Sequence, residues 1–459
     1  MQTRSSTKCL GLPAEVLTIF RCPVCQSSLD KKGTRTFRAS SLPTEKLHDE
    51  VGRASGEEGT QDRQAGFCRK LGRSFRWLPG YAWQRLVRRP TYCGHTHLII
   101  ALADHFEPSI LPHTNGKHAA REVQEQRLER WLRQYPRAVR DWPDSDGRPF
   151  RHTYFYPAEQ FDKGLIDSLV EHCKEGWGEI EIHLHHGTDV PDTAENTRRQ
   201  LLEFRDALAA RGCMSKEKGQ ESPRYAFVHG NFTLANSGNG TACGVDNEMQ
   251  ILAETGCYAD FTLPSAPNPS QVAKINSLYE CALPLDRRSP HRRGRDLECG
   301  YAPQIFPLIV QGPLMVTFAR RKHRRWRFPG IENGALTTLC PPTLERLKLW
   351  KKAAITVHGR PDWLFIKLSC HGMDPNDEDA MLGSSIQRFL SDLAREVRGS
   401  QFQVHFVTAR EMVNIIIAAC DGREGNPRDY RNYRLTLLEP QPRLSSDHLQ
   451  CSTVVERGL

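Results

Sequence analysis

From Thr96 onward, short apolar runs alternate with longer amphipathic stretches, and this alternation restricts the fold more than any other feature of the sequence. Thr96 to Ala103 (THLIIALA) is almost continuously apolar, as expected for a strand that is buried on both faces. Glu179 to His185 (EIEIHLH) alternates strictly, which is the period of a strand. Between them, Leu165, Leu169 and Cys173 recur at helical spacing. The repeated order of strand, helix and strand predicts an α/β fold around a parallel sheet.

The predicted strands number about eight, which suits a closed or nearly closed barrel. In chain order they cover residues 96–103, 151–156, 179–185, 225–229, 258–262, 305–310, 363–368 and 402–407. Two capping boxes, Asp192-x-x-Glu195 and Thr408-x-x-Glu411, are expected to begin helices. We therefore predict a distorted (β/α) barrel of seven or eight strands over residues 93–435, followed by a C-terminal tail over 436–459.

Residues 1–92 differ from the rest of the chain and are predicted to be a poorly structured extension. Ser40 to Phe67 is rich in Ser, Gly, Glu, Arg and Gln and has almost no periodic apolar pattern. Ahead of it, Cys22-Pro-Val-Cys25 resembles the knuckle of a zinc ribbon, but a ribbon needs a second CxxC and none follows. An isolated knuckle is therefore favoured over a complete zinc ribbon.

The net charge and the distribution of cysteines restrict the class of protein but do not identify its ligand. The net charge of +9 favours acidic partners in general, and the run Arg320 to Arg327 (RRKHRRWR) could hold phosphates. Such a run is more often a solvated loop, so nucleic-acid binding is disfavoured. The 15 cysteines are scattered, which favours a reduced, cytoplasmic protein. We expect no membrane span, because the most apolar stretch, Ile305 to Phe318, is interrupted by prolines.

Polar side chains follow the predicted strands at their carboxyl ends. Active-site groups of (β/α) barrels sit at these ends, so the pattern predicts one shared site. The catalytic and metal-binding candidates are Asp104, His105, His183, His185 and His371. The substrate-binding candidates are Glu159, His229, Asn231 and Asp260. Carbohydrate-stacking aromatics could be Tyr154, Tyr156, Trp177 and Phe232, although aromatic residues in strands more often belong to the core.

His183 and His185 carry the most specific signal. Two residues apart on a strand, their side chains share one face and can converge on one ion. Imidazoles with a carboxylate suit zinc or a similar divalent metal. The alternative is a pair of buried, hydrogen-bonded histidines, but Asp104 and His105 at another strand end favour the metal. His186 points the other way and is expected to be a supporting or structural residue.

Several segments together resemble the NodB-type polysaccharide deacetylases (carbohydrate esterase family four), and more closely an uncharacterised bacterial branch of that superfamily. They are LADHFEP, HTYFYPAEQ, EIEIHLHHG, FVHGNFTLANS, GCYADFTLPSAPNPSQ and FVTAREMVN, and they fall within residues 94–435. The resemblance implies a hydrolase in which metal-activated water removes acyl groups, expected to be N-acetyl, from a carbohydrate. An O-acyl ester remains an alternative substrate.

By this resemblance, Asp104 falls on the general base and His371 on the general acid, while His183 and His185 fall on the metal-binding histidines. His105 replaces the usual metal-binding Asp, so Asp104 could instead be the metal carboxylate. Other departures are HxHH in place of histidines four residues apart, and Gly187 and Ser369 where a further His or Asp is expected. These departures leave open a catalytically inactive glycan-binding or scaffold barrel. Cys370 beside His371 could suggest a thiol nucleophile, a hypothesis that we disfavour.

Overall fold

The computed structural model describes residues 75–88, 94–112, 118–320 and 327–438. Cys22 and Cys25, the interior of the basic run and most of the predicted C-terminal tail lie outside these residues, so the expectations for them stand as predictions. Among the described helices, none combines the length and the apolar character that crossing a bilayer requires.

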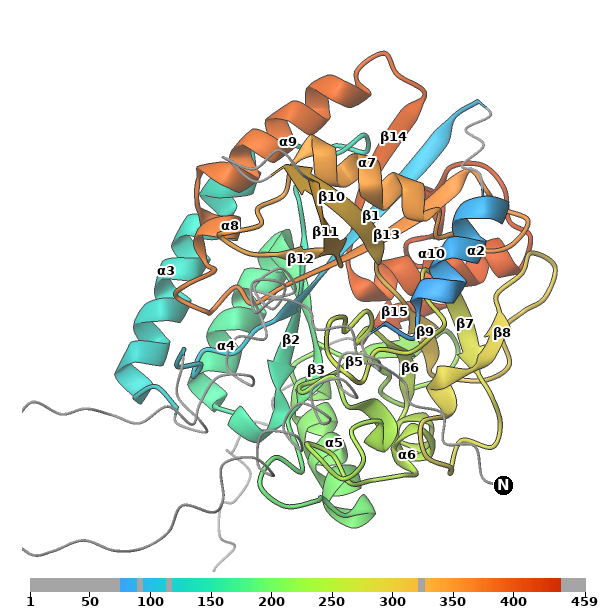
Figure 1. Ribbon diagram of the computed structural model, residues 1–459. Helices are drawn as coiled ribbons and strands as arrows, with labels where there is room; N and C mark the ends of the chain where they lie inside the picture. Colours follow the sequence, from blue (N-terminus) through green and yellow to red (C-terminus); the bar gives the residue numbers. More distant parts are fainter. Residues whose placement is uncertain (1–74, 89–93, 113–117, 321–326, 439–459) are drawn as a thin grey trace, which may run out of the picture.

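Strand β1 (Thr96–His105) belongs to an eleven-stranded sheet and lies near one end of its strand order (Figure 1). It pairs with β13 (Trp363–Cys370) along one edge. Its other edge is shared by β14 (Phe402–Val407), along the first half of the strand, and β2 (His152–Pro157), at its end. The sheet continues from β2 through β3 (Gly178–Leu184), β5 (Tyr225–His229), β6 (Cys257–Asp260) and β9 (Leu308–Val310), and every one of these pairs is parallel. The predicted α/β class with a mostly parallel sheet is confirmed.

The strand pairings form a path with two ends. Within the described residues the path runs from β12 (Ala335–Leu336) to β8 (Gly294–Asp296) and does not close into a ring. Near the β8 end, β7 (Leu278–Cys281) runs antiparallel to both β9 and β8. Within this sheet, the strands absent from the sequence prediction are β7, β8 and β12, which are too short to show a period. The closed barrel that we expected therefore stays a prediction, whereas the run of parallel strands is observed.

The two faces of β1 pack against different layers. Leu98, Ile100 and Leu102 join a core that includes residues of α3 (Arg121–Val139), α4 (Lys163–His172), α5 (Ala194–Ala209), α7 (Leu344–Ala353) and α9 (Ser384–Val397). Ile99, Ala101 and Ala103 join a second core built on α10 (Ala409–Cys420), in which every residue is buried. Because successive strand residues face opposite sides, Asp104 continues the first face and His105 the second.

Helix α10 begins at the predicted capping box. The Thr408 side chain accepts a hydrogen bond from the Glu411 backbone N–H, and Glu411 reaches back to the Thr408 N–H. The other predicted capping box is wrong, because the N-cap of α5 is Thr193, whose side chain accepts a hydrogen bond from the Asn196 N–H. The Asp192 carboxylate is occupied elsewhere, as described below.

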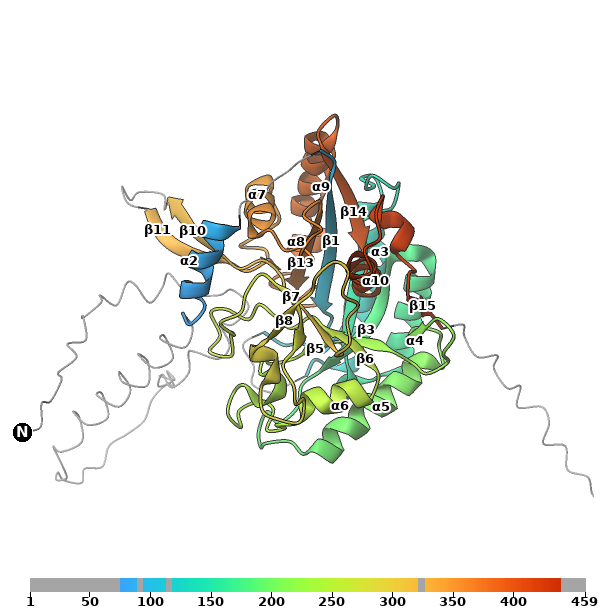
Figure 2. The same cartoon turned by 90° about the vertical axis from the view of Figure 1, so that its right-hand side faces the viewer.

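The remaining elements complete the outer layers. They are α2 (Leu78–Val87), α6 (Glu248–Glu254), α8 (Asp379–Leu382), β4 (Ser215–Glu217), β10 (Met315–Arg320), β11 (Arg327–Glu332) and β15 (Leu435–Leu437). Figure 2 shows α2 beside the hairpin of β10 and β11, and the buried Trp77 packs there with Ile275 and Leu314. The end of the segment that we assigned to the N-terminal extension is thus packed against the main body.

A buried ion pair joins α10 to the start of β3. The Arg410 Nη2 lies 2.7 Å from Glu179 Oε1, and its Nε lies 3.0 Å from Glu179 Oε2, so the contact is bidentate. Both side chains are 4% exposed. Because removing one partner leaves a buried charge with less compensation, this pair restricts how β3 can shift relative to α10.

We predict that Arg410→Met destabilises the protein by about 3–5 kcal/mol, since the Glu179 carboxylate stays buried without its bidentate partner. Thermal unfolding followed by circular dichroism would measure the loss. The matched control is Arg199→Met, which removes an exposed pair with Glu203 and should leave the midpoint almost unchanged. Equal midpoints for the two variants would contradict the assigned role of Arg410.

Candidate metal centre

Five side chains converge at the carboxyl ends of β1, β3 and β13. We call His105, Glu107, His183, His185 and His371 the His–Glu cluster. The ligand atoms of His105, Glu107 and His183 all lie within 4.8 Å of one another. Glu107 Oε1 lies 3.3 Å from His183 Nε2, 3.8 Å from His185 Nε2 and 3.9 Å from His371 Nε2. The structure thus brings together every predicted catalytic and metal-binding histidine around one carboxylate.

Strand register explains this convergence. His105 is opposite Phe155, and Pro157 is opposite His183, so the ends of β1, β2 and β3 lie along one edge of the sheet. On the other side of β1, Asp104 is opposite Cys370, which places His371 just beyond the end of β13. Parallel strands end at the same edge, and this edge is where open α/β sheets bind ligands.

Two ring nitrogens in the His–Glu cluster are buried without a hydrogen bond to any described residue. They are His183 Nε2 and His105 Nδ1. The other nitrogen of His183, Nδ1, donates to the Val228 carbonyl at 2.9 Å, so in the neutral ring the Nε2 lone pair faces Glu107. A buried lone pair beside a carboxylate is unfavourable unless a proton or a cation lies between them. The donor set therefore fits a metal ion.

In the buried part of the His–Glu cluster, the pKa shifts favour an ionised carboxylate and neutral imidazoles. Burial opposes ionisation of Glu107, but His185, His183 and His371 together lower its pKa to about 2. Burial and the neighbouring His371 and His183 hold the pKa of His105 well below its usual value. Burial and His185 likewise lower the pKa of His183. An ionised carboxylate with neutral imidazoles is the protonation state in which these groups bind divalent metals.

The outer part of the cluster is open to solvent. His185 and Glu159 side chains are 22% and 23% exposed, and His371 is 16% exposed. The Glu159 Oε1 lies 2.7 Å from His185 Nδ1, and its Oε2 accepts the His185 backbone N–H at 3.2 Å. Gly230 leaves room for the His185 ring, because a Cβ at Gly230 would lie 2.2 Å from His185 Cδ2. This pairing fixes the His185 tautomer with Nε2 toward Glu107.

Phe232 borders the same cluster, with its ring centroid 5.8 Å from that of His105. Tyr154 and Tyr156 are instead buried in the core. Trp177 packs beside His172, with ring centroids 6.3 Å apart. Of the aromatic residues considered for sugar stacking, Phe232 is therefore the one whose position beside the cluster is observed.

Asp104 lies on the opposite face of β1 and not in the His–Glu cluster. Its Oδ1 accepts the Gly372 backbone N–H at 2.7 Å, and its Oδ2 lies 3.3 Å from His152 Nε2. Asp104, His152 and Cys370 form a separate buried group among core side chains. We expected Asp104 to act as base or ligand beside His183. This geometry does not support that role, because adjacent strand residues point to opposite faces.

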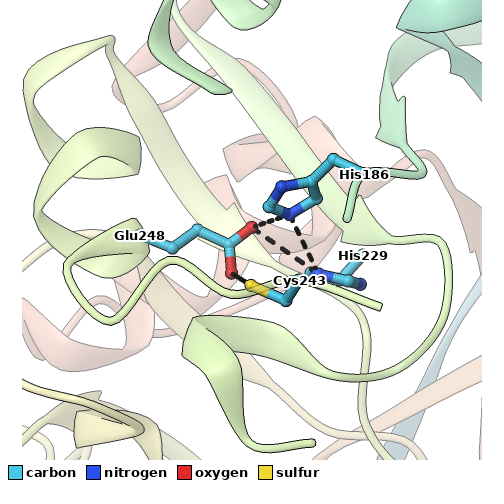
Figure 3. Close-up of side chains that lie close together, drawn as sticks. All are labelled: His186, His229, Cys243 and Glu248. Carbon is cyan, nitrogen blue, oxygen red and sulfur yellow. Dashed lines mark hydrogen bonds and ion pairs between the residues drawn. The ribbon is translucent and has the colours of Figure 1, made fainter. Parts of the chain in front are cut away.

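The predicted substrate-binding residues do not all lie at the His–Glu cluster. Glu159 contacts His185, as expected for a residue of the site. His229 instead lies 3.1 Å from His186, Nε2 to Nε2, in a second buried group with Cys243 and Glu248 (Figure 3). Asn231 donates its backbone N–H to His229 Nδ1 at 3.3 Å, and the buried Asp260 accepts from Thr262.

Glu107 is the functional residue that the sequence analysis missed. It stands two residues after His105, the same spacing as His183 and His185, and each pair places two side chains in the His–Glu cluster. Gly187, noted as a departure from the family pattern, has φ +61°, and a Cβ there would lie 1.9 Å from the Cys243 carbonyl oxygen. A residue with a side chain could not occupy this position without moving the backbone of Cys243.

Comparisons with known proteins leave the family open. No protein-family model and no curated protein matches the chain. Among solved structures, it is similar to an alpha-mannosidase from Enterococcus faecalis V583, at 11% identity and a TM-score of 0.31. The match covers 70% of this chain, which spans 29% of the length of that protein. At this TM-score the similarity carries no argument about fold or function.

We predict that His185 in the metal-free protein titrates near pH 9, because Glu107 and Glu159 outweigh the burial that disfavours its charge. Its pKa is raised, so its contribution to stability is complete below about pH 6.5 and is lost as the pH rises through about 9. Glu159→Gln should lower this pKa, as measured by NMR of labelled histidine in chelator-treated protein. An unchanged pKa would contradict the pairing, and Glu175→Gln, an exposed site, is the control.

Proposed function

We propose that the protein is a metal-dependent hydrolase of the polysaccharide-deacetylase type, which removes acyl groups, in the first place N-acetyl groups, from a carbohydrate. The observation that carries the proposal is the half-open His–Glu cluster. Its buried side has nitrogens without hydrogen bonds beside an ionised carboxylate, whereas its outer side presents exposed proton-carrying groups. Catalytic metal sites need protein ligands on one side and an open position on the other.

His105, Glu107 and His183 would hold the cation, which we take to be zinc because the donors are imidazole and carboxylate. When bound, a divalent cation lowers the pKa of a water molecule and polarises an acyl carbonyl. In this assignment Glu107 supplies the metal carboxylate that the family resemblance had placed at Asp104 or His105. Asp104 keeps a structural role, accepting from Gly372 and facing His152.

The exposed residues would carry the proton transfers. A cation bound to Glu107 would offset the negative charge that keeps the His185 ring protonated in the metal-free protein. His185, oriented by Glu159, would then take a proton at Nε2 from the attacking water, in the arrangement of an imidazole held by a carboxylate. His371 would give a proton to the leaving amine or alcohol, as the resemblance implies. Both Nε2 atoms lie near Glu107 Oε1, at 3.8 Å and 3.9 Å, so each flanks the place where the reacting atoms must lie.

The choice of a carbohydrate amide as substrate rests on the resemblance alone. It agrees with the partly exposed Phe232 ring beside His105, since aromatic faces stack on sugar rings. An acetyl ester would meet the same residues, because the attacked carbonyl is the same and only the leaving atom differs.

The test is acetate release from N-acetylglucosamine oligomers and from acetylated xylan by the full chain loaded with zinc. We predict turnover that falls more than about 100-fold in His183→Ala and in Glu107→Gln, because each removes a metal ligand. Metal analysis of the same preparations should show less bound zinc. Zinc binding without acetate release from any acetylated glycan would contradict the hydrolase and favour the inactive glycan-binding alternative.

Two control variants separate the site from its surroundings. Glu181→Gln changes a buried carboxyl on β3 whose pKa is raised by burial to about 8, so Gln imitates the form already present at neutral pH. Asp104→Asn changes the acid that lies on the opposite face of β1. Both should keep their zinc content, and a loss of zinc in Asp104→Asn equal to that in Glu107→Gln would contradict the ligand assignment.

A further inference from the structure

A second convergence of ligand atoms lies beside the carboxyl ends of β3 and β5. His186 follows β3, His229 ends β5, Cys243 lies in the loop over residues 237–247, and Glu248 begins α6. All four side chains are buried, and their ligand atoms lie within 4.8 Å of one another. Figure 3 shows the two imidazoles, the thiol and the carboxylate directed toward one another. We call this group the Cys243 cluster.

The spacing of these atoms is that of ligands around a small cation. His186 Nε2 lies 3.1 Å from His229 Nε2 and 3.0 Å from Glu248 Oε1, and His229 Nε2 lies 3.7 Å from the same oxygen. Cys243 Sγ lies 3.6 Å from Glu248 Oε2. In a tetrahedral zinc site, metal–ligand bonds of the usual length separate two nitrogens, or a nitrogen and an oxygen, by about 3.3–3.4 Å.

Carboxylate support behind His186 matches the arrangement around metal-bound histidines. Asp192 Oδ2 lies 3.0 Å from His186 Nδ1, which directs the Nε2 lone pair into the cluster. Asp192 is itself held by Thr197, Asn196 and the Thr193 backbone. This explains why Asp192 does not cap α5. Glu248 is fixed in turn by the Ala235 N–H, which donates to its Oε2.

The backbone around Cys243 is under strain that the fold must offset. Phe232, Ala235, Asn236, Asn239 and Ala242 all have positive φ, between 45° and 62°. Such conformations cost non-glycine residues about 1 kcal/mol or more each, and they persist where the surroundings hold them in place. The Gly187 backbone also lies against the Cys243 carbonyl, at a distance that no Cβ would allow. The loop is thus held where its thiol meets the two histidines.

We propose that His186, His229, Cys243 and Glu248 form a structural site for one divalent cation of the zinc type, separate from the His–Glu cluster. With four protein ligands and all of them buried, the site has no open position for a substrate, which is the pattern of a structural metal. The cation links β3 and β5 to α6 and to the loop that carries Cys243. It thereby holds the end of β3, which presents His183 and His185.

The competing arrangement contains no metal. In it, a protonated His186 lies between Asp192 and Glu248, and His229 accepts the Asn231 N–H at Nδ1, 3.3 Å away, with its own proton on Nε2. That network uses the thiol of Cys243 only as a weak donor, to Glu248 and to the Val245 carbonyl. A cation at His229 Nε2 would move the ring proton to Nδ1 and break the long contact with Asn231. The role of the sulfur and the proton on His229 therefore distinguish the two arrangements.

Cobalt(II) added to the chelator-treated full chain tests the proposal, because a cobalt–thiolate bond gives a charge-transfer absorption. The background carries Cys22→Ser and Cys25→Ser, which removes the other candidate thiolate pair. We predict the band in this background, its persistence in His183→Ala, Cys370→Ser and Cys281→Ser, and its loss in Cys243→Ser. Cys281 is the matched control, being a buried cysteine outside all three clusters.

Two further measurements cover a Cys243→Ser variant that fails to fold. X-ray absorption of the zinc-loaded background protein should show a sulfur at about 2.3 Å, without any change at Cys243. Asp192→Asn should weaken cobalt binding at this site by about 10–100-fold while the far-ultraviolet spectrum is kept. No charge-transfer band in the background, or a band unchanged in folded Cys243→Ser, would overturn the proposal.

Discussion

The parallel pairing of β1 on both of its edges is the constraint on which the rest of the structure depends. Because β13 lies along one edge and β2 joins the end of the other, the residues that follow three strands are brought to one edge of the sheet. Pleating then divides the end of β1 between two layers. Asp104 enters the core formed with α3, α4, α5, α7 and α9, beside His152, whereas His105 enters the side that holds Glu107 and His183.

The two proposed metal sites differ in how far their residues are exposed to solvent. In the His–Glu cluster, Glu107 and His183 are buried, while His185 and His371, with the neighbouring Glu159, stay accessible to solvent. In the Cys243 cluster every ligand is buried, and Asp192 and Ala235 hold its members from behind. His185 and His186 are adjacent in the sequence and point into different clusters, so the HxHH motif serves both. Loss of the cation from the Cys243 cluster would therefore disturb the His–Glu cluster, because both clusters take residues from the end of β3.

Most strands of the sheet and part of the candidate site could be predicted from the sequence, and physical reasons explain which parts could not. Every predicted strand is present because long buried runs such as residues 96–103 and 363–368 carry a clear apolar pattern. The short strands β7 and β8 escaped notice, since three or four residues show no period. The histidines were found by spacing, and Glu107 could have been found by the same rule. Cys243 and Glu248 could not, because their approach to His186 depends on a loop whose path no local pattern encodes.

Anomalous X-ray diffraction at the zinc absorption edge, from crystals of the full chain grown with zinc, tests the central claim most directly. The account predicts a peak bounded by His105, Glu107 and His183, on the side of β1 opposite to Asp104. A map with no peak there, and with His183 Nε2 hydrogen-bonded directly to Glu107, would contradict it. A peak beside Asp104 and His152 instead would return the metal to the residue that the sequence first suggested.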